Sequence, residues 1–251
     1  MNRPPRILAG IPARYTSTRF PGKALALLAG RPMIEHVYRR VASVKQIEKV
    51  IVATDDERIA AAVRGFGGEA RLTSAAHRSG TDRLAELFAE VECDLVVNVQ
   101  GDEPLIDPRA IEQALEPFLL DARLQVSTLK TRIHTLETLM SPHAVKVVTD
   151  ADGFAVSFSR APEPHVGPGM AVDLERAAYF KHLGLYVYRR DFLLEFAQWP
   201  STPREQQEAL EQWRMLEHGV RIKVVETPYD SIGVDTPADL ARAEAALRSQ
   251  V

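Results

Sequence analysis

Short apolar runs rich in β-branched residues alternate with helical segments along the first half of this 251-residue chain. The apolar runs predict buried strands over residues 7–12, 50–54 and 94–99. Apolar residues recur at helical spacing between and after these runs, which predicts helices over residues 32–44, 55–63 and 81–91 and from residue 107 onward. Strands that alternate with helices through short loops form a parallel sheet with helices on both faces. The pattern therefore predicts an α/β fold, with a mostly parallel sheet flanked by helices.

The middle of the chain, over approximately residues 122–190, is richer in strands. Strand-like runs lie at residues 125–132, 145–149, 154–158 and 182–189, with a hairpin turn at 150–153 and a loop over 160–178. We predict that this β-rich region lies within a single domain spanning residues 1–251. It could form a second lobe or a dimer surface.

The α/β pattern returns in the last fifty residues. A capping box from Thr202 to Glu205 predicts one helix that continues through Leu216. Residues 221–226 read as a strand, and Thr236 begins a capping sequence that predicts the last helix.

Composition excludes several classes of protein. The single cysteine, Cys93, excludes an intramolecular disulfide framework and a multi-cysteine zinc site, and it fits a reducing compartment. No apolar run approaches membrane-spanning length, and the start of the chain does not read as a signal peptide. We therefore expect a cytoplasmic protein without a membrane partner. A net charge of −3 argues against general nucleic-acid binding.

Positive charge is concentrated at the start of the chain. The first 40 residues carry eight arginine and lysine residues against one glutamate, so the rest of the chain is acidic. A basic segment on an acidic body is typical of a local anion site, such as one for phosphate. The alternative is that these cations only solvate the surface of a helix.

The loop after the first predicted strand concentrates groups that bind phosphate. It joins the cations Arg14, Arg19 and Lys23 to the hydroxyl of Ser17, and Gly22 allows the backbone to approach a ligand. It is not a Walker A loop, and the chain has no G-x-G-x-x-G fingerprint, so a dinucleotide cofactor is not expected. Its position after a strand favours phosphate binding over an exposed basic loop.

Three further motifs follow strands or begin helices. Asp102 follows the strand at 94–99 and could hold Mg²⁺, or could be a solvated acid of a turn. Asp235 precedes the last helix, where helix-start chemistry explains it equally well. A small polar segment from Ser79 to Arg83 begins a helix and could contact a base or ribose, or could be a plain helix N-terminus.

Eight motifs together carry a resemblance to a known family. In order they are PARYTSTRFPGK, HRSGTDRLAE, NVQGDEP, HAVKVV, FSRAP, KHLGLYVYRR, LEQWRMLEHG and GVDTPADL. From about residue 6 to about residue 245 the chain resembles the 3-deoxy-manno-octulosonate (Kdo) cytidylyltransferase, or CMP-Kdo synthetase, family. The resemblance implies a Rossmann-like nucleotidyltransferase fold, a homodimer, and the reaction of CTP with Kdo to give CMP-Kdo and pyrophosphate. It also implies a requirement for Mg²⁺ and a place in lipopolysaccharide synthesis.

The resemblance also implies roles for individual residues, carried over motif by motif. The predicted catalytic residues are Arg14, Lys23, Asp102 and Asp235, of which Asp102 and Asp235 would bind the metal. The predicted CTP-binding residues are Arg14, Ser17, Arg19, Lys23, Ser79, Gly80, Thr81 and Gln100. The predicted sugar-binding residues are Gln100, Arg160, His182, Tyr186, Glu211 and Gln212.

Physical chemistry supports part of the sugar-binding set. Arg160 can meet a carboxylate in a bidentate manner. His182 and Tyr186 are four residues apart on a predicted strand, so both are expected on the same face. That spacing equally allows two structural residues that face the core.

The sequence leaves two alternatives to this function, one in the sugar substrate and one in the functional class. The loop after Arg160 differs from the family pattern at Glu163 and His165, so the substrate could be a modified Kdo, or another sugar acid such as sialic acid. A nucleotide-binding module without turnover is the alternative from another functional class. The retained pair of Asp102 and Asp235 argues against it, because binding alone does not demand both carboxylates.

Overall fold

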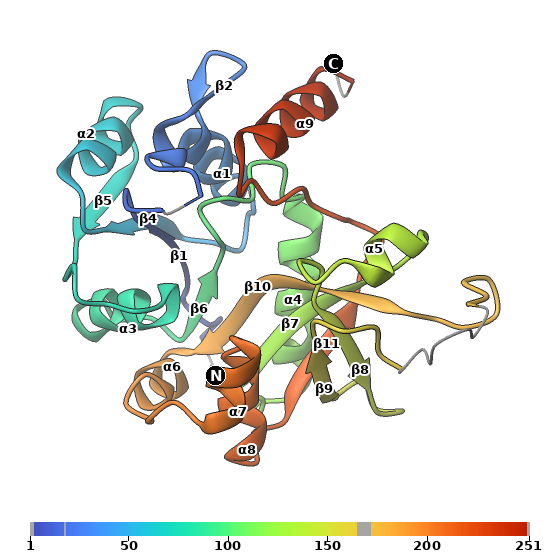
Figure 1. The fold of residues 1–251 in the computed structure, drawn as a ribbon. Helices are drawn as coiled ribbons and strands as arrows, with labels where there is room; N and C mark the ends of the chain where they lie inside the picture. Colours follow the sequence, from blue (N-terminus) through green and yellow to red (C-terminus); the bar gives the residue numbers. More distant parts are fainter. Residues whose placement is uncertain (1–2, 18, 165–171, 250–251) are drawn as a thin grey trace.

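The chain folds around a large mixed sheet in a computed structural model that describes residues 3–17, 19–164 and 172–249. Among these residues, nine strands form the sheet, and seven of them lie side by side in the order β11-β7-β10-β6-β1-β4-β5. Figure 1 shows helices on both faces of the sheet, with α2 and α3 at one end and α5, β8 and β9 at the other. The predicted α/β fold with a sheet flanked by helices is confirmed.

The first half of the chain supplies the parallel part of the sheet. Its strands are β1 (Ile7–Ala13), β4 (Lys49–Thr54), β5 (Glu69–Leu72) and β6 (Leu95–Asn98). β1 pairs in parallel with β4 and β6, and β4 pairs in parallel with β5. The sequence did not predict β5, because this edge strand contains two charged residues and has no buried residue to produce an apolar signal.

Helices cover this part of the sheet on both faces. They are α1 (Met33–Ala42), α2 (Glu57–Gly65), α3 (Gly80–Glu90) and α4 (Pro108–Leu120). The buried faces of α1, α2 and α4 belong to one hydrophobic cluster with Ile11 and Val97, whereas α3 packs with Leu8 and Val96 in a second cluster. Alternate residues of β1 and β6 therefore face the two layers, as the period of a strand requires. Asp56, Ser79 and Asp107 cap three of these helices through side-chain hydrogen bonds.

The second half of the chain adds strands of both directions. These are β7 (Val126–Arg132), β8 (Lys146–Thr149), β9 (Ala155–Ser159), β10 (Phe180–Arg189) and β11 (Ile222–Glu226). β10 lies between β6 and β7 and is antiparallel to both, while β11 is parallel to β7. β7 and β10, which fall in the predicted β-rich region, thus belong to the main sheet. β8 and β9 pair with each other and extend it beside β10.

Short elements connect and cover the sheet. They are η1 (Lys23–Leu25), the hairpin strands β2 (Leu27–Leu28) and β3 (Arg31–Pro32), α5 (Leu136–Met140) and α6 (Arg190–Phe196). The predicted hairpin turn at 150–153 is confirmed, with the amide of Gly153 donating to the carbonyl of Asp150 at 3.0 Å. The last helix, α9 (Pro237–Arg248), begins with the predicted capping box of Thr236 and Asp239. No helix in the described parts of the chain is long and apolar enough to cross a membrane.

The helix predicted to run from Thr202 through Leu216 is wrong as one element. The capping box of Thr202 and Glu205 begins α7 (Pro203–Glu208), but the helix ends there, and α8 (Gln212–Glu217) follows separately. Ala209 adopts a left-handed backbone conformation, with φ of 51°, which no helix can continue through. The break places Glu211 at the start of α8, where its side chain can point toward α3.

Gly10, in the middle of β1, allows α3 to pack closely against the sheet. A Cβ atom at this position would lie 2.5 Å from Leu84 Cδ2 and 2.9 Å from Phe88 Cε2. We expect Gly10→Ala to lower the free energy of unfolding by about 1–3 kcal/mol through overpacking, measured by urea denaturation. Gly65→Ala, where a Cβ would meet open space, is the matched control and should change stability by less than about 0.5 kcal/mol. Equal stabilities of the two variants would contradict this account of the packing.

Candidate active site

The loop between β1 and η1 is held in place by a backbone hydrogen bond and by stacking. The amide of Gly22 donates to the carbonyl of Tyr15 at 2.9 Å. Gly22 has a φ of 70°, and a Cβ there would lie 3.0 Å from the Tyr15 ring, so both the turn and the close approach favour glycine. The guanidinium of Arg58 in α2 covers the same ring at 3.4 Å. These contacts fix a loop that would otherwise be repelled by its own cations.

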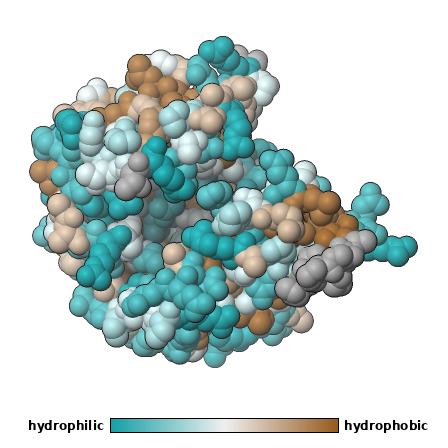
Figure 2. All heavy atoms as spheres, in the orientation of Figure 1, coloured by the Kyte–Doolittle hydropathy of each residue, from teal (hydrophilic) through white to brown (hydrophobic). Residues whose placement is uncertain are grey.

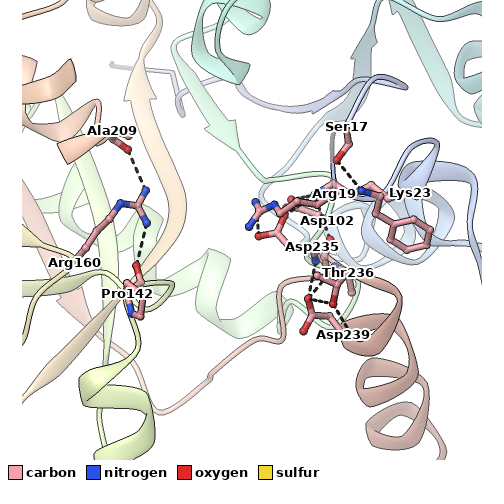
Figure 3. Close-up of polar contacts among 12 residues, drawn as sticks. Ser17, Arg19, Lys23, Asp102, Pro142, Arg160, Ala209, Asp235, Thr236 and Asp239 are labelled. Carbon is pink, nitrogen blue, oxygen red and sulfur yellow. Dashed lines mark hydrogen bonds and ion pairs between the residues drawn. The ribbon is translucent and has the colours of Figure 1, made fainter. Parts of the chain in front are cut away.

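Lys23 joins the two aspartates that were predicted to bind a metal. Its Nζ donates to Asp102 Oδ2 at 2.5 Å and to Asp235 Oδ1 at 3.0 Å. Arg19 forms an ion pair with the other oxygen of Asp235 at 2.9 Å, and Figure 3 shows all four side chains converging. The amide of Val234 donates to the carbonyl of Asp102 at 2.9 Å, which fastens the loop before α9 to the loop after β6.

Charge compensation dominates the electrostatics of this cluster. Burial opposes the charge on Lys23, but Asp102 and Asp235 outweigh that effect and raise the pKa of its ammonium group. Among the described residues, no group of three or more His, Cys, Asp and Glu side chains could hold a metal ion. Two convergent carboxylates do fit Mg²⁺, which uses few protein ligands and completes its coordination shell with phosphate and water.

A cavity of about 420 Å³ adjoins the cluster at the carboxyl ends of β1 and β6. It is lined by nearly all of the predicted CTP-binding and metal-binding residues: Arg14, Ser17, Arg19, Lys23, Ser79, Gly80, Gln100, Asp102 and Asp235. Its lining residues come largely from the loops that follow β1 and β6, at the edge where parallel sheets commonly bind ligands. In Figure 2 the face of the molecule is hollowed near its centre, with mainly hydrophilic residues at the border.

Two ionisable side chains of this cavity, His77 and Arg78, were not named as site residues from the sequence. They line it together with the predicted residues and with Arg83 of the segment from Ser79 to Arg83. Arg83 is buried and forms an ion pair with Asp55 at 3.0 Å, which ties α3 to the end of β4. A signal for His77 and Arg78 was present, because both lie within the HRSGTDRLAE motif.

Thr81 lies apart from the other predicted CTP-binding residues. Its neighbours Ser79 and Gly80 line the cavity, but Thr81 is buried and is not among the lining residues. Its hydroxyl donates to Glu211 Oε2 at 3.0 Å. Glu211 in turn lines a second cavity of about 1200 Å³, which shares Ser79 with the first.

A compact group of buried polar side chains lies against β10, an interior strand of the sheet, and consists of His182, Tyr186 and Gln212. The rings of His182 and Tyr186 lie 5.5 Å apart, which confirms that both residues face the same side of β10. Gln212 Nε2 donates to the hydroxyl of Tyr186 at 2.5 Å. β10 bulges between Leu183 and Tyr186, and the spacing of the two rings survives because the bulge adds two residues rather than one.

Thr128 on β7 stabilises this bulge and orients the histidine. Its hydroxyl lies 2.7 Å from the carbonyl oxygen of Leu185 and 2.8 Å from His182 Nε2. Since the hydroxyl donates to the carbonyl, we assign the proton to Nε2, which then donates to the hydroxyl. Burial lowers the pKa of His182 to about 3, and burial together with Glu211 raises the pKa of Tyr186. Both side chains are therefore neutral at physiological pH.

Arg160 lies apart from the phosphate-side cluster in Figure 3. Its guanidinium donates to three backbone carbonyls, those of Glu208 at 3.0 Å, Pro142 at 3.1 Å and Ala209 at 3.2 Å. The bonds to Glu208 and Ala209 satisfy carbonyl groups exposed where α7 ends, and the bond to Pro142 ties this point to the loop after α5. Sequence reasoning did not foresee this structural role. His165, in the loop that follows Arg160, lies outside the described residues. The assignment of Arg160 to the sugar carboxylate stays a prediction.

Comparisons with known proteins bear on the chemistry of this site. A sequence model of the cytidylyltransferase family matches residues 8–222. A 3-deoxy-manno-octulosonate cytidylyltransferase of Geotalea uraniireducens is 57% identical over 244 residues, which cover 94% of this chain and 97% of the relative. Another, of Solibacter usitatus, is 48% identical over 251 residues, which cover 99% of this chain and 97% of that relative. A solved structure of a CMP:2-keto-3-deoxy-manno-octonic acid synthetase complexed with CTP is 43% identical, with a TM-score of 0.90, covering 98% of this chain and 100% of that chain.

The environment of His182 gives a prediction about pH. Because burial lowers the pKa of His182 to about 3 in the folded state, its imidazole should stay neutral from pH 8 down to pH 5. NMR of labelled histidine would measure this. The unfolded chain takes up this proton near pH 6.5, so the histidine's contribution to the free energy of unfolding falls below that pH, by about 1.4 kcal/mol per pH unit. His182→Asn identifies the resonance and should flatten this pH dependence. A His182 signal that titrates between pH 5 and pH 7 would overturn the assignment.

Proposed function

We infer that this chain, which belongs to the cytidylyltransferase family and within it to the 3-deoxy-manno-octulosonate cytidylyltransferases, transfers CMP from CTP to Kdo and releases pyrophosphate. The family membership confirms the resemblance that the eight sequence motifs carry. The observation that supports the activity most directly is the convergence of Lys23, Asp102 and Asp235 at one side of the 420 Å³ cavity. That cavity brings phosphate-binding cations and metal-binding carboxylates to the same edge of the sheet.

The cations of the loop after β1 would bind the triphosphate. Arg14, Arg19 and Lys23 line the cavity and carry the positive charge that a bound triphosphate needs. On binding, Arg19 and Lys23 would exchange their aspartate partners for phosphate oxygens. The two aspartates would then hold Mg²⁺, which supplies charge neutralisation at the phosphates and lowers the pKa of a coordinated hydroxyl.

The reaction itself is an in-line displacement at phosphorus. The anomeric hydroxyl of Kdo attacks the α-phosphorus, a new P–O bond forms, and the bond to pyrophosphate breaks, while the hydroxyl proton passes to solvent water. Lys23 and the arginines stabilise the negative charge that builds on the departing pyrophosphate. His182 is a poor proton acceptor because burial lowers its pKa to about 3, so no histidine base is assigned at this position.

The sugar acid would bind on the side of the site formed by β10 and α8. Gln100, His182, Tyr186, Glu211 and Gln212 supply donors and acceptors for its hydroxyl groups. Arg160 can meet the carboxylate of the sugar acid by exchanging one of its backbone carbonyl partners for it.

We also propose a homodimer, located in the cytoplasm and serving lipopolysaccharide synthesis. The support for a dimer is a group of exposed apolar side chains in the β-rich region: Leu136 and Met140 on α5 and Val156 on β9. Such side chains are commonly covered by a partner chain.

The substrate test is pyrophosphate release in the presence of CTP and Mg²⁺. We expect release with Kdo and a rate at least about tenfold lower with N-acetylneuraminate, because a site built for one set of hydroxyls rejects another. Release with the sialic acid alone would assign the protein to that substrate. No release with either sugar would favour a nucleotide-binding module without turnover.

The metal assignment is tested by Asp102→Asn. This change keeps the size of the side chain but removes a charged ligand, so we expect kcat to fall at least about a hundredfold. The melting temperature should fall by only about 2–4 °C, because Lys23 keeps Asp235 as a partner. Binding of Mn²⁺ in the presence of CTP, followed by electron paramagnetic resonance, should weaken in parallel. Asp191→Asn, at a fully exposed aspartate, is the matched control. Near-normal turnover of Asp102→Asn at saturating Mg²⁺ would refute the assignment.

A further inference from the structure

A buried hydrogen bond connects the nucleotide side of the site to the sugar side. Thr81 lies in the first turn of α3, two residues after Ser79, and its side chain is only 4% exposed. Its hydroxyl donates to Glu211 Oε2 at 3.0 Å across 130 positions of sequence. Glu211 directly precedes α8, just after the break at Ala209.

The second oxygen of Glu211 faces a fixed arginine. Arg214 Nη2 lies 3.5 Å from Glu211 Oε1 and 2.9 Å from Glu205 Oε1. Arg214 Nη1 donates to the carbonyl of Trp199 at 2.9 Å, and the guanidinium lies over the ring of Phe196. Because these partners come from α6, α7 and the loop between them, the arginine has little freedom to turn.

The first turn of α8 also holds an acceptor that the protein does not use. Gln212 donates its amide nitrogen to Tyr186, but among the described residues its Oε1 has no hydrogen-bond partner although it is buried. A buried acceptor without a donor costs free energy unless a ligand supplies one. Glu211 and Gln212 therefore present adjacent acceptors, and the carboxylate of Glu211 is held by Thr81 from α3 and by Arg214 from the first turn of α8 itself.

We propose that Thr81 and Arg214 are positioning residues that hold the carboxylate of Glu211 in the orientation needed to accept hydroxyl groups of the sugar acid. The inference rests on the proposed function, in which Glu211 binds the sugar. It assigns Thr81 to the sugar side of the reaction, rather than to the nucleotide whose other residues surround it. It also means that the helix whose first turn meets CTP helps to orient a sugar-binding group.

The charges around Glu211 show what loss of a donor would do. Burial raises the pKa of Glu211, and Asp82 on α3 adds to that effect. Ser79 and Thr81 on α3 and Arg214 on α8 oppose it, while the neutral hydroxyls of Tyr186 and Tyr188 face it from β10. Removing one of the opposing donors raises the pKa further and leaves the carboxylate free to turn.

Steady-state kinetics with separate variation of Kdo and CTP tests the proposal. For Thr81→Val, which keeps the shape of the side chain and removes the hydroxyl, we expect the KM for Kdo to rise roughly tenfold. The KM for CTP should stay within about twofold, and Thr81→Ser should restore the KM for Kdo because it restores the donor. The acidic limb of kcat/KM for Kdo should move to higher pH in Thr81→Val. Thr227→Val, at another buried threonine, is the matched control.

Arginine variants give an independent test of the second donor. Arg214→Lys should also raise the KM for Kdo, because a point charge cannot hold Glu205 and Glu211 together in the geometry of a guanidinium. Arg204→Lys, at an arginine that stacks on Trp213 in the same region, is the matched control.

The possible results separate the inference from the proposed function. Carbon-13 NMR of labelled glutamate measures the pKa of Glu211 without any substrate, and this pKa should be higher in Thr81→Val than in wild type. An unchanged pKa of Glu211, or a rise in the KM for CTP alone, would overturn the inference while leaving the proposed function intact. A wild-type protein that releases no pyrophosphate with Kdo would overturn the proposed function, and the inference with it.

Discussion

The contact of Lys23 with Asp102 and Asp235 is the interaction on which the site depends. It joins positions that are 79 and 212 residues apart in sequence, and it does so where the sheet ends. Each charge is partly removed from water, so the loss of one partner would leave the others poorly compensated. Holding three loops together by charge also leaves them ready for a triphosphate, because the same cations can exchange carboxylate oxygens for phosphate oxygens.

The side of the site proposed to bind the sugar acid is organised differently, by backbone irregularities and buried neutral groups. A bulge in β10, held by Thr128, brings His182 and Tyr186 within ring contact. The left-handed residue Ala209 ends α7, and Arg160 satisfies the carbonyls at that end. The left-handed backbone at Ala209, with Arg160 bound to the neighbouring carbonyls, thus ends α7 where Glu211 can contact α3 and Gln212 can contact β10.

Much of the fold could be predicted because its signals are local. Apolar runs marked β1, β4 and β6, and the capping boxes at Thr202 and Thr236 marked the starts of α7 and α9. β5 was missed because an edge strand needs little burial, and the break at Ala209 was missed because alanine ordinarily favours helix. Ala209 is exposed, and the contacts at this point are the hydrogen bonds from Arg160 to the carbonyls of Glu208 and Ala209. A propensity scale does not describe such contacts between distant residues.

The sequence by itself determined the chemistry of the phosphate side, since the loop cations and the two aspartates are recognisable by type and by their places after strands or before a helix. Only the tertiary structure decided that Thr81 meets Glu211 and not the nucleotide cavity, and that Arg160 bonds to the end of α7. The physical reason is distance along the chain. Composition and spacing report which groups follow a strand, whereas a contact across 130 residues depends on how helices pack on the sheet.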